Sequence, residues 1–285
     1  MFNSVPILMF HDIHADNAGP KDNFSVAESD FRKQIEYLHH NGYAGVSLAN
    51  FLKGKQEEES PSHQVTKSPE EQNVPDTRKK VILTFDDGDI SNHTVAAQVL
   101  KGAGFTATFF ITVNEIGKDG RMSWENIYEL SRQGMDVGSH GMTHVFFPSM
   151  SSYNLLNELL ASKQVLEKYI RRRVDFLSVP RGFYNKGILD IARDVGFKAV
   201  CVSDAGYNDF LDEDIFCLRR FAMRHSYTLA AFRSIVAGAP QLNVVALENL
   251  RTFLRGVLGY QFYHRLRVWK GNSEVSKDQK IESRE

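Results

Sequence analysis

The sequence predicts an α/β fold with a parallel sheet or barrel, and two observations lead to this prediction. At four places an amphipathic segment ends in glycine and continues into a hydrophobic residue and a short β-like run; the glycines are Gly42, Gly104, Gly134 and Gly196. Glycine just past a helix end adopts the left-handed conformation that stops the helix, and the next residues enter a strand. These units alternate with further strand-like runs, as they do in parallel α/β proteins.

The individual elements follow from the hydrophobic pattern along the chain. Short apolar runs without polar alternation are typical of strands that are buried on both faces. The predicted strands are residues 6–10, 44–48, 81–85, 106–111, 136–138, 175–179 and 198–202. The predicted helices are residues 31–41, 95–103, 127–133, 152–172 and 188–195. In the long helix 152–172, Leu155, Leu159 and Leu166 recur on one face, as in an amphipathic helix.

Three segments interrupt or follow this pattern. Residues 54–80 are rich in Glu, Ser, Pro, Gln and Lys, so they cannot bury enough apolar surface to fold alone and are predicted to be a disordered insertion. Residues 228–270 have a helical pattern and are predicted to form a C-terminal helical extension, followed by a polar tail over residues 271–285. The predicted organisation is therefore one domain over residues 1–227 that contains the insertion, then the extension and the tail.

The composition excludes several classes of protein. The formal net charge of -1 gives no general attraction to nucleic acid, so no nucleic-acid partner is expected. Two cysteines, Cys201 and Cys217, are too few for a disulfide framework or a cysteine zinc cluster. The sequence shows neither a secretory signal pattern nor an apolar stretch long enough to cross a membrane, which predicts a cytoplasmic location.

The C-terminal extension carries one further hypothesis. Within residues 244–269, apolar side chains such as Leu258 and Trp269 are mixed with arginines such as Arg255 and Arg265. Basic residues mixed with Trp and Leu are typical of a helix that lies on a membrane surface, here the inner membrane surface. An apolar stripe more often packs against its own domain as a final helix, and the sequence leaves both interpretations open.

Two adjacent carboxylates mark the first candidate site. Asp86 and Asp87 follow directly after the predicted strand 81–85, and in parallel α/β folds the residues at the carboxyl ends of strands face the active site. Neighbouring carboxylates repel each other unless a cation or a shared proton relieves them, so one could bind a metal while the other acts as a base. The alternative is an Asx-type turn in which an aspartate caps the next helix.

A histidine pair follows another predicted strand. His140 and His144 come after the run 136–138, and their spacing suits one metal ion if the backbone turns helically. Alone, the pair could equally be two solvated histidines. Combined with one of the two aspartates, however, the histidines would leave open metal positions for water and substrate, as a catalytic rather than a structural site requires.

These motifs resemble those of the NodB-homology polysaccharide deacetylases, carbohydrate esterase family four. The matching segments are residues 84–88 for the first motif, 139–144 for the second, 178–184 for the third, and 5–11 for the opening strand of one branch of the family. The resemblance spans roughly residues 5–220, and its first two motifs are the most specific.

The resemblance implies a fold, a reaction and a set of site residues. The fold would be a distorted parallel (β/α) barrel with fewer than eight strands, and the reaction the removal of N-acetyl or other N-acyl groups from an amino-sugar polysaccharide of the cell envelope or its precursor. One divalent metal ion would be held by Asp87, His140 and His144, and Asp86 would be the base that activates metal-bound water. The groove wall and the oxyanion contact would come from Pro180, Arg181, Gly182 and Tyr184. Zinc suits this ligand set best, and nickel or cobalt would also fit.

Two departures from the family pattern leave roles open. Many members carry an arginine that orients the base at the position of Ser178, so Arg181 or Arg220 would have to orient it here. The late Leu-x-His motif, whose histidine is the general acid in many members, has no clear match. His11, at the end of the first strand, is the preferred proton donor, and His225 is the other candidate. A buried, hydrogen-bonded histidine is the structural alternative for His11.

Three other functions compete with this prediction. A haloacid-dehalogenase-like phosphatase also places acids after a strand, but it leaves the two histidines unexplained. A deformylase or amidase that acts on a lipid-linked sugar or a small cyclic amide would use the same fold. A non-catalytic member that only binds saccharide would fit Ser178 and the missing late histidine, whereas the intact metal set argues against it.

Overall fold

The structure is a computed structural model that describes residues 4–59, 79–210 and 214–239. The chain divides into two compact units, Met1–Pro240 and Gln241–Glu285, and all described residues belong to the first. Residues 240–285, with most of the predicted extension and the whole tail, lie outside the described residues, as do residues 60–78 of the predicted insertion. The predicted division into domains therefore stays a prediction.

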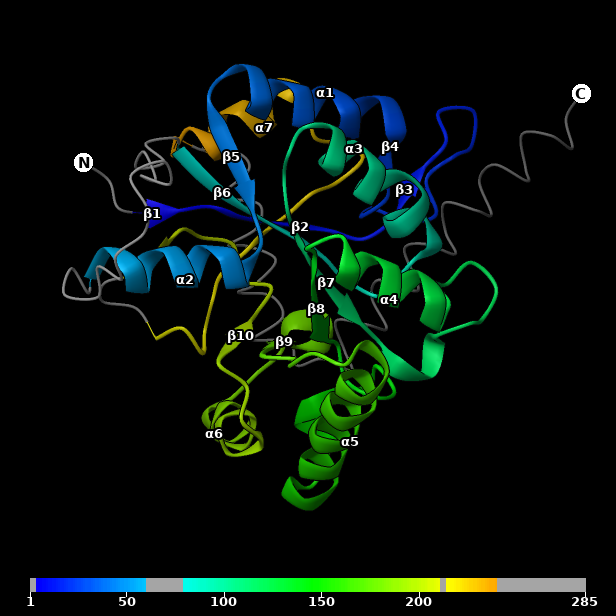
Figure 1. Cartoon of the computed structure of the whole chain (residues 1–285), viewed down its shortest axis with the longest axis vertical. Helices are drawn as coiled ribbons and strands as arrows, with labels where there is room; N and C mark the ends of the chain where they lie inside the picture. The colour runs from blue at the N-terminus through cyan, green and yellow to red at the C-terminus, as the bar shows by residue number, and fades with distance from the viewer. Residues whose placement is uncertain (1–3, 60–78, 211–213, 240–285) are drawn as a thin grey trace, which may run out of the picture. The chain divides into compact units, whose positions relative to one another are not determined.

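A parallel sheet of eight strands forms the centre of the first unit (Figure 1). The strands are β2 (Ile7–Phe10), β5 (Tyr43–Val46), β6 (Lys79–Phe85), β7 (Thr108–Ile111), β8 (Asp136–Ser139), β9 (Phe176–Ser178), β10 (Ala199–Cys201) and β12 (Phe221–Ala222). Seven of them follow one another in the order β10-β9-β8-β7-β6-β2-β12, and β5 pairs with β6 off this path. Every pair is parallel, as the repeated helix–glycine–strand units predict.

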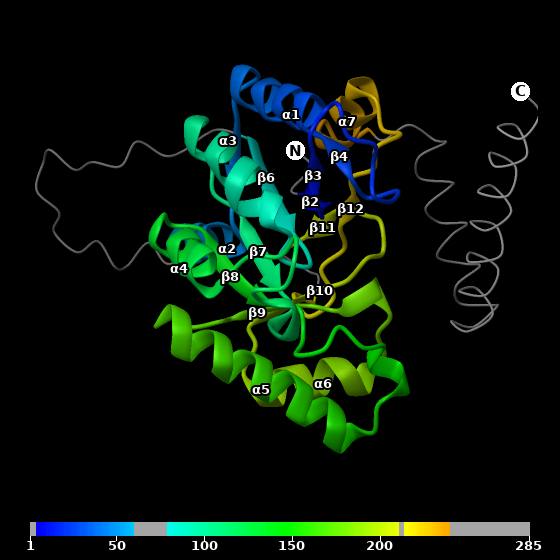
Figure 2. The same ribbon diagram turned by 90° about the vertical axis from the view of Figure 1, so that its right-hand side faces the viewer.

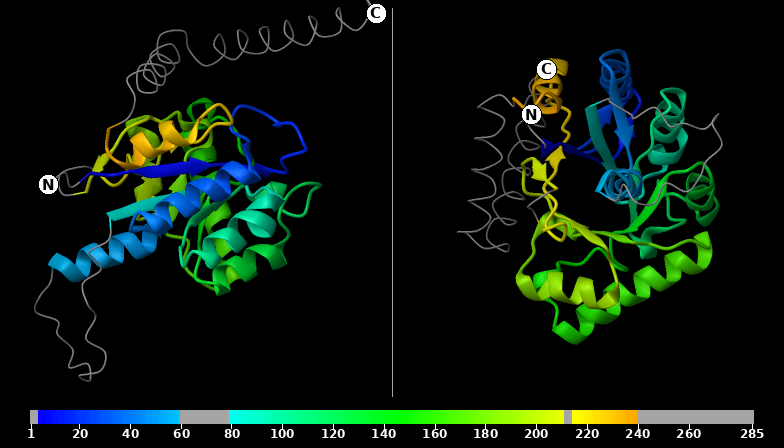
Figure 3. Two further views of the ribbon diagram at one scale, coloured as in Figure 1. Left: turned by 90° about the horizontal axis from the view of Figure 1, so that it is seen from above. Right: turned by 60° about the vertical axis from the view of Figure 1, so that its left-hand side comes forward.

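One short segment links the two ends of this seven-strand path. Leu218 exchanges backbone hydrogen bonds with Val200 and Val202 beside β10, and three residues later β12 pairs with β2. The strands therefore curl around a common interior (Figure 3). This arrangement confirms the predicted distorted parallel barrel with fewer than eight strands around it. Two small sheets flank it, β1 (Ser4–Val5) with β11 (Asn208–Asp209), and β3 (Ile13–His14) with β4 (Val26–Ala27).

Helices cover the outside of the barrel. They are α1 (Glu28–His40), α3 (Ala97–Gly102), α4 (Trp124–Arg132), α5 (Ser152–Ile170), α6 (Lys186–Val195) and α7 (Leu229–Val236). Ser123 and Ser151 accept hydrogen bonds from backbone amides at the starts of α4 and α5, and Gly196 ends α6 with a φ of 90°. In Figure 2, α1 lies beside α7 and α5 beside α6.

Helix α2 (Leu48–Glu59) closes the amino end of the barrel and is absent from the predicted elements. Its first amides, those of Leu48 and Ala49, donate to Thr108 and Asp136, which begin β7 and β8. Leu48 and Phe51 pack in one buried cluster with six strand residues and Leu218; the strand residues are Ile7, Ile82, Phe110, Phe176, Ala199 and Cys201. Burying a side chain such as Phe51 stabilises the fold by roughly 1.5–3 kcal/mol.

At both ends, residues that the sequence assigns to the insertion 54–80 belong to regular elements in the structure. Residues 54–59 continue α2, because the buried first turns of that helix support its polar second half. Lys79 and Lys80 are already part of β6 and pair with Tyr43 and Ala44 of β5.

Helix α7, which the sequence places in the C-terminal extension, packs against α1. The ring of Phe232 meets Tyr37 edge-on with centroids 6.3 Å apart, and the guanidinium of Arg233 lies 4.8 Å from the same ring. The hydroxyl of Tyr207 donates to the carbonyl of Ile235 over 2.8 Å. The first compact unit therefore includes this helix. None of the helices in the described part of the chain has both the length and the apolar character that a membrane span requires.

Candidate active site

The candidate residues meet where neighbouring strands end. Asp86 follows β6, His140 follows β8, and His11 follows β2. The segment that begins at Pro180 comes two residues after β9. Because parallel strands present their carboxyl ends at the same edge of a sheet, four separate segments of sequence contribute to one region.

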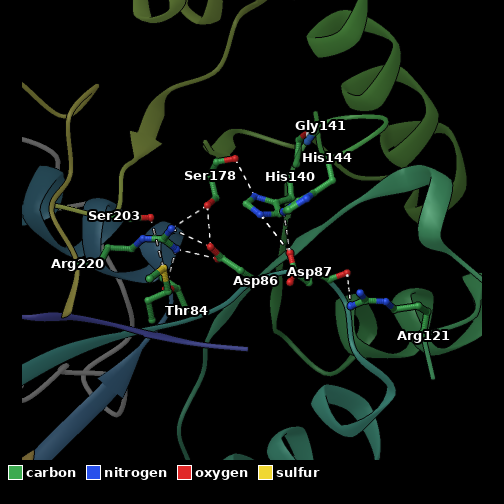
Figure 4. Close-up of polar contacts among 12 residues, drawn as sticks. Thr84, Asp86, Asp87, Arg121, His140, Gly141, His144, Ser178, Ser203 and Arg220 are labelled. Atoms are coloured by element: carbon green, nitrogen blue, oxygen red, sulfur yellow. Dashed lines mark hydrogen bonds and ion pairs between the residues drawn. The ribbon is translucent and has the colours of Figure 1, made fainter. Parts of the chain in front are cut away.

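Asp87, His140 and His144 converge on one point (Figure 4). Oδ1 of Asp87 lies 3.3 Å from Nε2 of each histidine, and the three ligand atoms lie within 4.8 Å of one another. Within the described residues this buried Oδ1 has no hydrogen-bond partner of good geometry. A buried carboxylate oxygen without a partner costs free energy, and a cation between two imidazoles and a carboxylate would satisfy it. The residues present therefore fit a divalent metal ion.

The backbone around these three residues adopts uncommon conformations. Asp87 and His144 have φ values of 75° and 57°, in the left-handed region that non-glycine residues seldom occupy. Gly141, between the two histidines, has a φ of 80°. Non-glycine residues in this region, here Asp87 and His144, cost about 1–3 kcal/mol each and persist only where the surroundings hold them. The strain in the turns after β6 and β8 therefore accompanies the inward placement of Asp87 and His144.

Two contacts hold the histidine loop in place. Oε1 of the buried Glu158 on α5 accepts hydrogen bonds from the amides of Met142 and Thr143 over 2.8 and 2.7 Å. Nδ1 of His140 lies 2.9 Å from the carbonyl oxygen of Ser178. Because a carbonyl oxygen only accepts, Nδ1 carries the proton and the lone pair of Nε2 faces Asp87. Glu158 is absent from the residues that the sequence predicts, because its only signal is a carboxylate among leucines on one helix face.

Asp86 is held by Arg220 inside the barrel (Figure 4). Nη1 and Nη2 of Arg220 donate to Oδ1 and Oδ2 of Asp86, each over 2.8 Å. Ser178 joins this pair, because its hydroxyl donates to Oδ2 of Asp86 over 3.0 Å and accepts from Nη2 over 2.8 Å. Arg220 also donates to the carbonyl of Val202 and the hydroxyl of Thr84, and it is fully buried. Of the two arginines that the sequence leaves open, Arg220 is the one bonded to Asp86.

The two neighbouring carboxylates both stay ionised, for different reasons. Burial disfavours the charge on Asp86, but the charge and hydrogen bonds of Arg220 together with the nearby histidines outweigh it and lower the pKa of Asp86. Burial also disfavours the charge on Asp87, but its contacts with the imidazoles of His140 and His144 hold the pKa of Asp87 well below its ordinary value. Burial would lower the pKa of His140, but the charge of Asp86 and the contact with Asp87 raise it. Arg220 is therefore the main counter-charge of Asp86, whereas Asp87 faces the two imidazoles.

Residues 180–182 form a tight turn beside Ser178. Pro180 and Gly182 are buried, and Arg181 is exposed with a φ of 63°. At Gly182, with a φ of 75°, a Cβ would lie 2.3 Å from Cβ of Ser203. Only glycine fits this close approach. The predicted groove wall thus lies next to the residues that hold Asp86.

Tyr184 and His225 have other surroundings. The hydroxyl of Tyr184 donates to Oδ2 of Asp204 over 3.3 Å and accepts from the thiol of Cys217 over 3.0 Å, and burial raises the pKa of Tyr184. These contacts are with residues outside the metal-ligand cluster. His225 is exposed, three residues beyond the end of β12.

His11 lines a cavity of 260 Å³ together with Asp87. Its ring stacks on Phe24 with centroids 4.7 Å apart, and the guanidinium of Arg224 lies 4.6 Å from the ring of Phe24. Nδ2 of Asn92 donates to the carbonyl of His11 over 2.6 Å. Nδ1 of His11 is buried and has no hydrogen-bond partner among the described residues. His11 is thus held firmly while this ring nitrogen is unsatisfied, which argues against a purely structural histidine.

Known proteins resemble this chain in sequence and in fold. The family model of the polysaccharide deacetylases matches residues 73–200. YxkH of Bacillus subtilis is 26% identical over 232 residues, 81% of this chain and 76% of the relative. A peptidoglycan-N-acetylglucosamine deacetylase of Bacillus cereus is 26% identical over 128 residues, 45% of this chain and 58% of the relative.

Among solved structures, the deacetylase PplD of Streptococcus pyogenes has a TM-score of 0.70 at 22% identity, over 82% of this chain and 98% of PplD. This likeness is one of fold. The motifs, the fold and the family match over residues 73–200 agree, and in all three the chain is similar to the polysaccharide deacetylases.

Proposed function

We propose that this protein is a metal-dependent N-deacetylase that removes acetyl groups from the amino sugars of a cell-envelope polysaccharide or its precursor. The observation that carries the proposal is the convergence of Asp87, His140 and His144 beside a carboxylate that a buried arginine holds. The family match supports a saccharide substrate, and the relative that is named for peptidoglycan N-acetylglucosamine supports an amino sugar. Zinc is the proposed ion, because it favours two imidazoles and a carboxylate with open positions.

Each residue of the site has a proposed task in amide hydrolysis. A divalent ion held by the Asp87–His140–His144 cluster would polarise the acyl carbonyl and lower the pKa of water. Asp86 accepts the proton of the attacking water, and Arg220 fixes its orientation while keeping it ionised. Each carboxylate oxygen has two lone pairs, so Asp86 can bind Arg220 and still accept a further hydrogen bond.

Two other segments supply the proposed oxyanion donor and the proposed proton donor. The amide of Arg181 is the proposed donor to the oxyanion, because the turn 180–182 directly follows the strand that carries Ser178. His11 is the proposed proton donor to the leaving amine, since it lines the same cavity as Asp87.

The direct experiment combines metal analysis with product analysis on N-acetylglucosamine oligomers. The expected result is about one divalent ion per chain and release of acetate that stops on chelation. Release of formate from N-formyl substrates but no acetate would favour the deformylase alternative. Saccharide binding without release of any acyl group would show a non-catalytic member and contradict the proposal.

The role of His11 has its own test with a matched histidine. We expect His11→Ala to lower kcat about 10²–10⁴-fold at unchanged metal content, because the leaving amine loses its proton donor. His225→Ala removes an exposed histidine and should leave kcat unchanged. The opposite result would transfer the role to His225.

The location of the protein stays a prediction. A cytoplasmic protein that touches the inner membrane surface through residues 244–269 would bind anionic vesicles, with weaker binding at higher salt. This segment lies outside the described residues, and co-sedimentation of the full chain with vesicles tests the idea.

A further inference from the structure

The cavity beside Asp87 contains polar groups that the hydrolysis itself does not use. Three segments build it: the segment between β2 and β4, the turn after β6 and the loop that precedes α4. The lining residues are His11, Asp12, Lys21, Asp22, Asp87, Asp89, Asp119, Gly120 and Arg121.

Hydrogen bonds tie these three segments together. Nζ of Lys21 lies 2.7 Å from Oδ2 of Asp89, which joins the first segment to the turn after β6. The amide of Ile90 donates to the carbonyl of Gly120 over 2.9 Å, which joins that turn to the loop before α4. The cavity wall is therefore a folded part of the protein and not a gap between unconnected loops.

Asp12 is a buried acid of this cavity. It is 7% exposed, and its Oδ1 accepts a hydrogen bond from the hydroxyl of Ser25 over 2.9 Å. Its Oδ2 is buried and has no hydrogen-bond partner among the described residues, and the same is true of Nδ1 of the adjacent His11. A buried carboxylate oxygen without a partner is costly, so a ligand that donates a hydrogen bond to Asp12 would remove that cost.

The charge of the cavity indicates what kind of donor it takes. Asp87 belongs to the metal-ligand cluster, and Asp89 is paired with Lys21. The remaining charged side chains of the lining are Asp12, Asp22, Asp119 and Arg121, three carboxylates and one guanidinium. A concave surface with an excess of carboxylates attracts cations, so a positively charged donor is favoured over a neutral hydroxyl.

We infer that this cavity binds the free ammonium group of a glucosamine unit next to the N-acetylated unit that reacts, and that Asp12 recognises it. The inference rests on the proposed function, and it names a preferred substrate, a partly deacetylated chain. Each cleavage produces such an ammonium group, so the product of one turnover becomes the recognition element for a neighbouring unit. Deacetylation would then proceed preferentially at units beside earlier cleavages.

The test is a binding measurement by calorimetry on the full chain. It compares a glucosamine tetramer with an N-acetylglucosamine tetramer, and wild type should bind the glucosamine tetramer about tenfold more tightly. Asp12→Asn keeps the oxygen that accepts from Ser25 but removes the charge, and the preference should fall to about one. Asp194→Asn removes an equally charged, exposed side chain on α6 and should keep the preference.

Each other outcome overturns the inference. Equal affinity of wild type for both tetramers removes the preference, and an equal loss for both tetramers in Asp12→Asn would show recognition of a hydroxyl. If Asp12→Asn has a lower melting temperature than wild type, only the wild-type protein is used for the test. A ratio near one between its affinities for the glucosamine and N-acetylglucosamine tetramers then contradicts the inference. Binding needs no turnover, so a lack of acetate release would contradict the proposed function and leave this measurement valid.

Discussion

Asp86 and Asp87 are neighbours in the chain, yet the two regions around them differ in almost every respect. Asp86 is buried, and both of its oxygens are bonded to Arg220, with Ser178 as a further donor. Asp87 has a strained backbone and a partly exposed side chain, and its Oδ1 faces two histidines without a hydrogen bond. The fold supplies a cation for the first carboxylate and leaves the second one open to an ion. We therefore distinguish the proposed base, Asp86, from the proposed metal ligand, Asp87, by what each carboxylate faces: Arg220 for Asp86 and two histidines for Asp87.

The Arg220–Asp86 pair is better understood as a device for orientation than as a source of stability. Burying two charges costs desolvation energy that their attraction often only offsets. The bidentate geometry, however, fixes the carboxylate plane, and the hydroxyl of Ser178 closes the network on one side. Among the described residues, no arginine or lysine is bonded to the carboxylate of Asp87, which faces the two histidines instead.

The largest expected effect lies on the side of Asp87. His140→Ala should lose the bound ion and lower acetate release about 10³-fold, because the ion contributes several kcal/mol to the reaction. The unfolding free energy of the metal-free protein should change far less than activity does. Metal analysis, kinetics and urea unfolding in chelator measure the three quantities. If His140→Ala keeps both its ion and its activity, the region of Asp87 is not the metal site that we propose.

On the side of Asp86 the expected effect is on stability. Arg220→Met should lower the unfolding free energy by about 3–5 kcal/mol, because it leaves Asp86 buried without its counter-charge. The double variant Asp86→Asn/Arg220→Met should lose less than the sum of the two single variants, since neither unpaired charge remains. Urea unfolding of the four proteins checks this, and strictly additive losses would show that the pair is not coupled.

The smallest expected effect is on acid stability. The pKa of Asp86 is lowered in the folded protein from an ordinary value of 3.8, so its contribution is fully present above pH 3.8 and is lost as the pH falls through the folded pKa. Removing the pair by Asp86→Asn/Arg220→Met should therefore make the unfolding free energy less dependent on pH below 3.8, by up to about 1.4 kcal/mol per pH unit. Equal slopes in wild type and the double variant, both measured in chelator, would contradict the assigned shift.

The sequence predicted the barrel and the ligand cluster because both depend on local signals. A helix that ends in glycine before a strand is visible within about fifteen residues, and both metal motifs directly follow strands. Arg220 carries no such signal, because it meets Asp86 across 134 positions of sequence and precedes a strand of two residues. Glu158 and Asp12 are single acids whose importance depends entirely on what packs around them.

Helix α2 shows a different limit of the sequence. Its second half is polar and merges with the composition of the following insertion, so only the burial of Leu48 and Phe51 distinguishes it as a helix. Burial at the amino end of a barrel depends on tertiary packing, which local propensity does not encode.

The most direct measurement compares Asp86→Asn with Asp87→Asn for bound metal and acetate release, using variants that retain the wild-type circular dichroism spectrum. We predict that Asp86→Asn keeps about one ion per chain and loses about 10²–10⁴-fold in kcat, because only the base is removed. Asp87→Asn should lose both the ion and the activity, since the carboxylate is one of the three proposed metal ligands. An Asp86→Asn protein without metal beside a fully loaded Asp87→Asn protein would contradict the central claim that the two carboxylates have different partners.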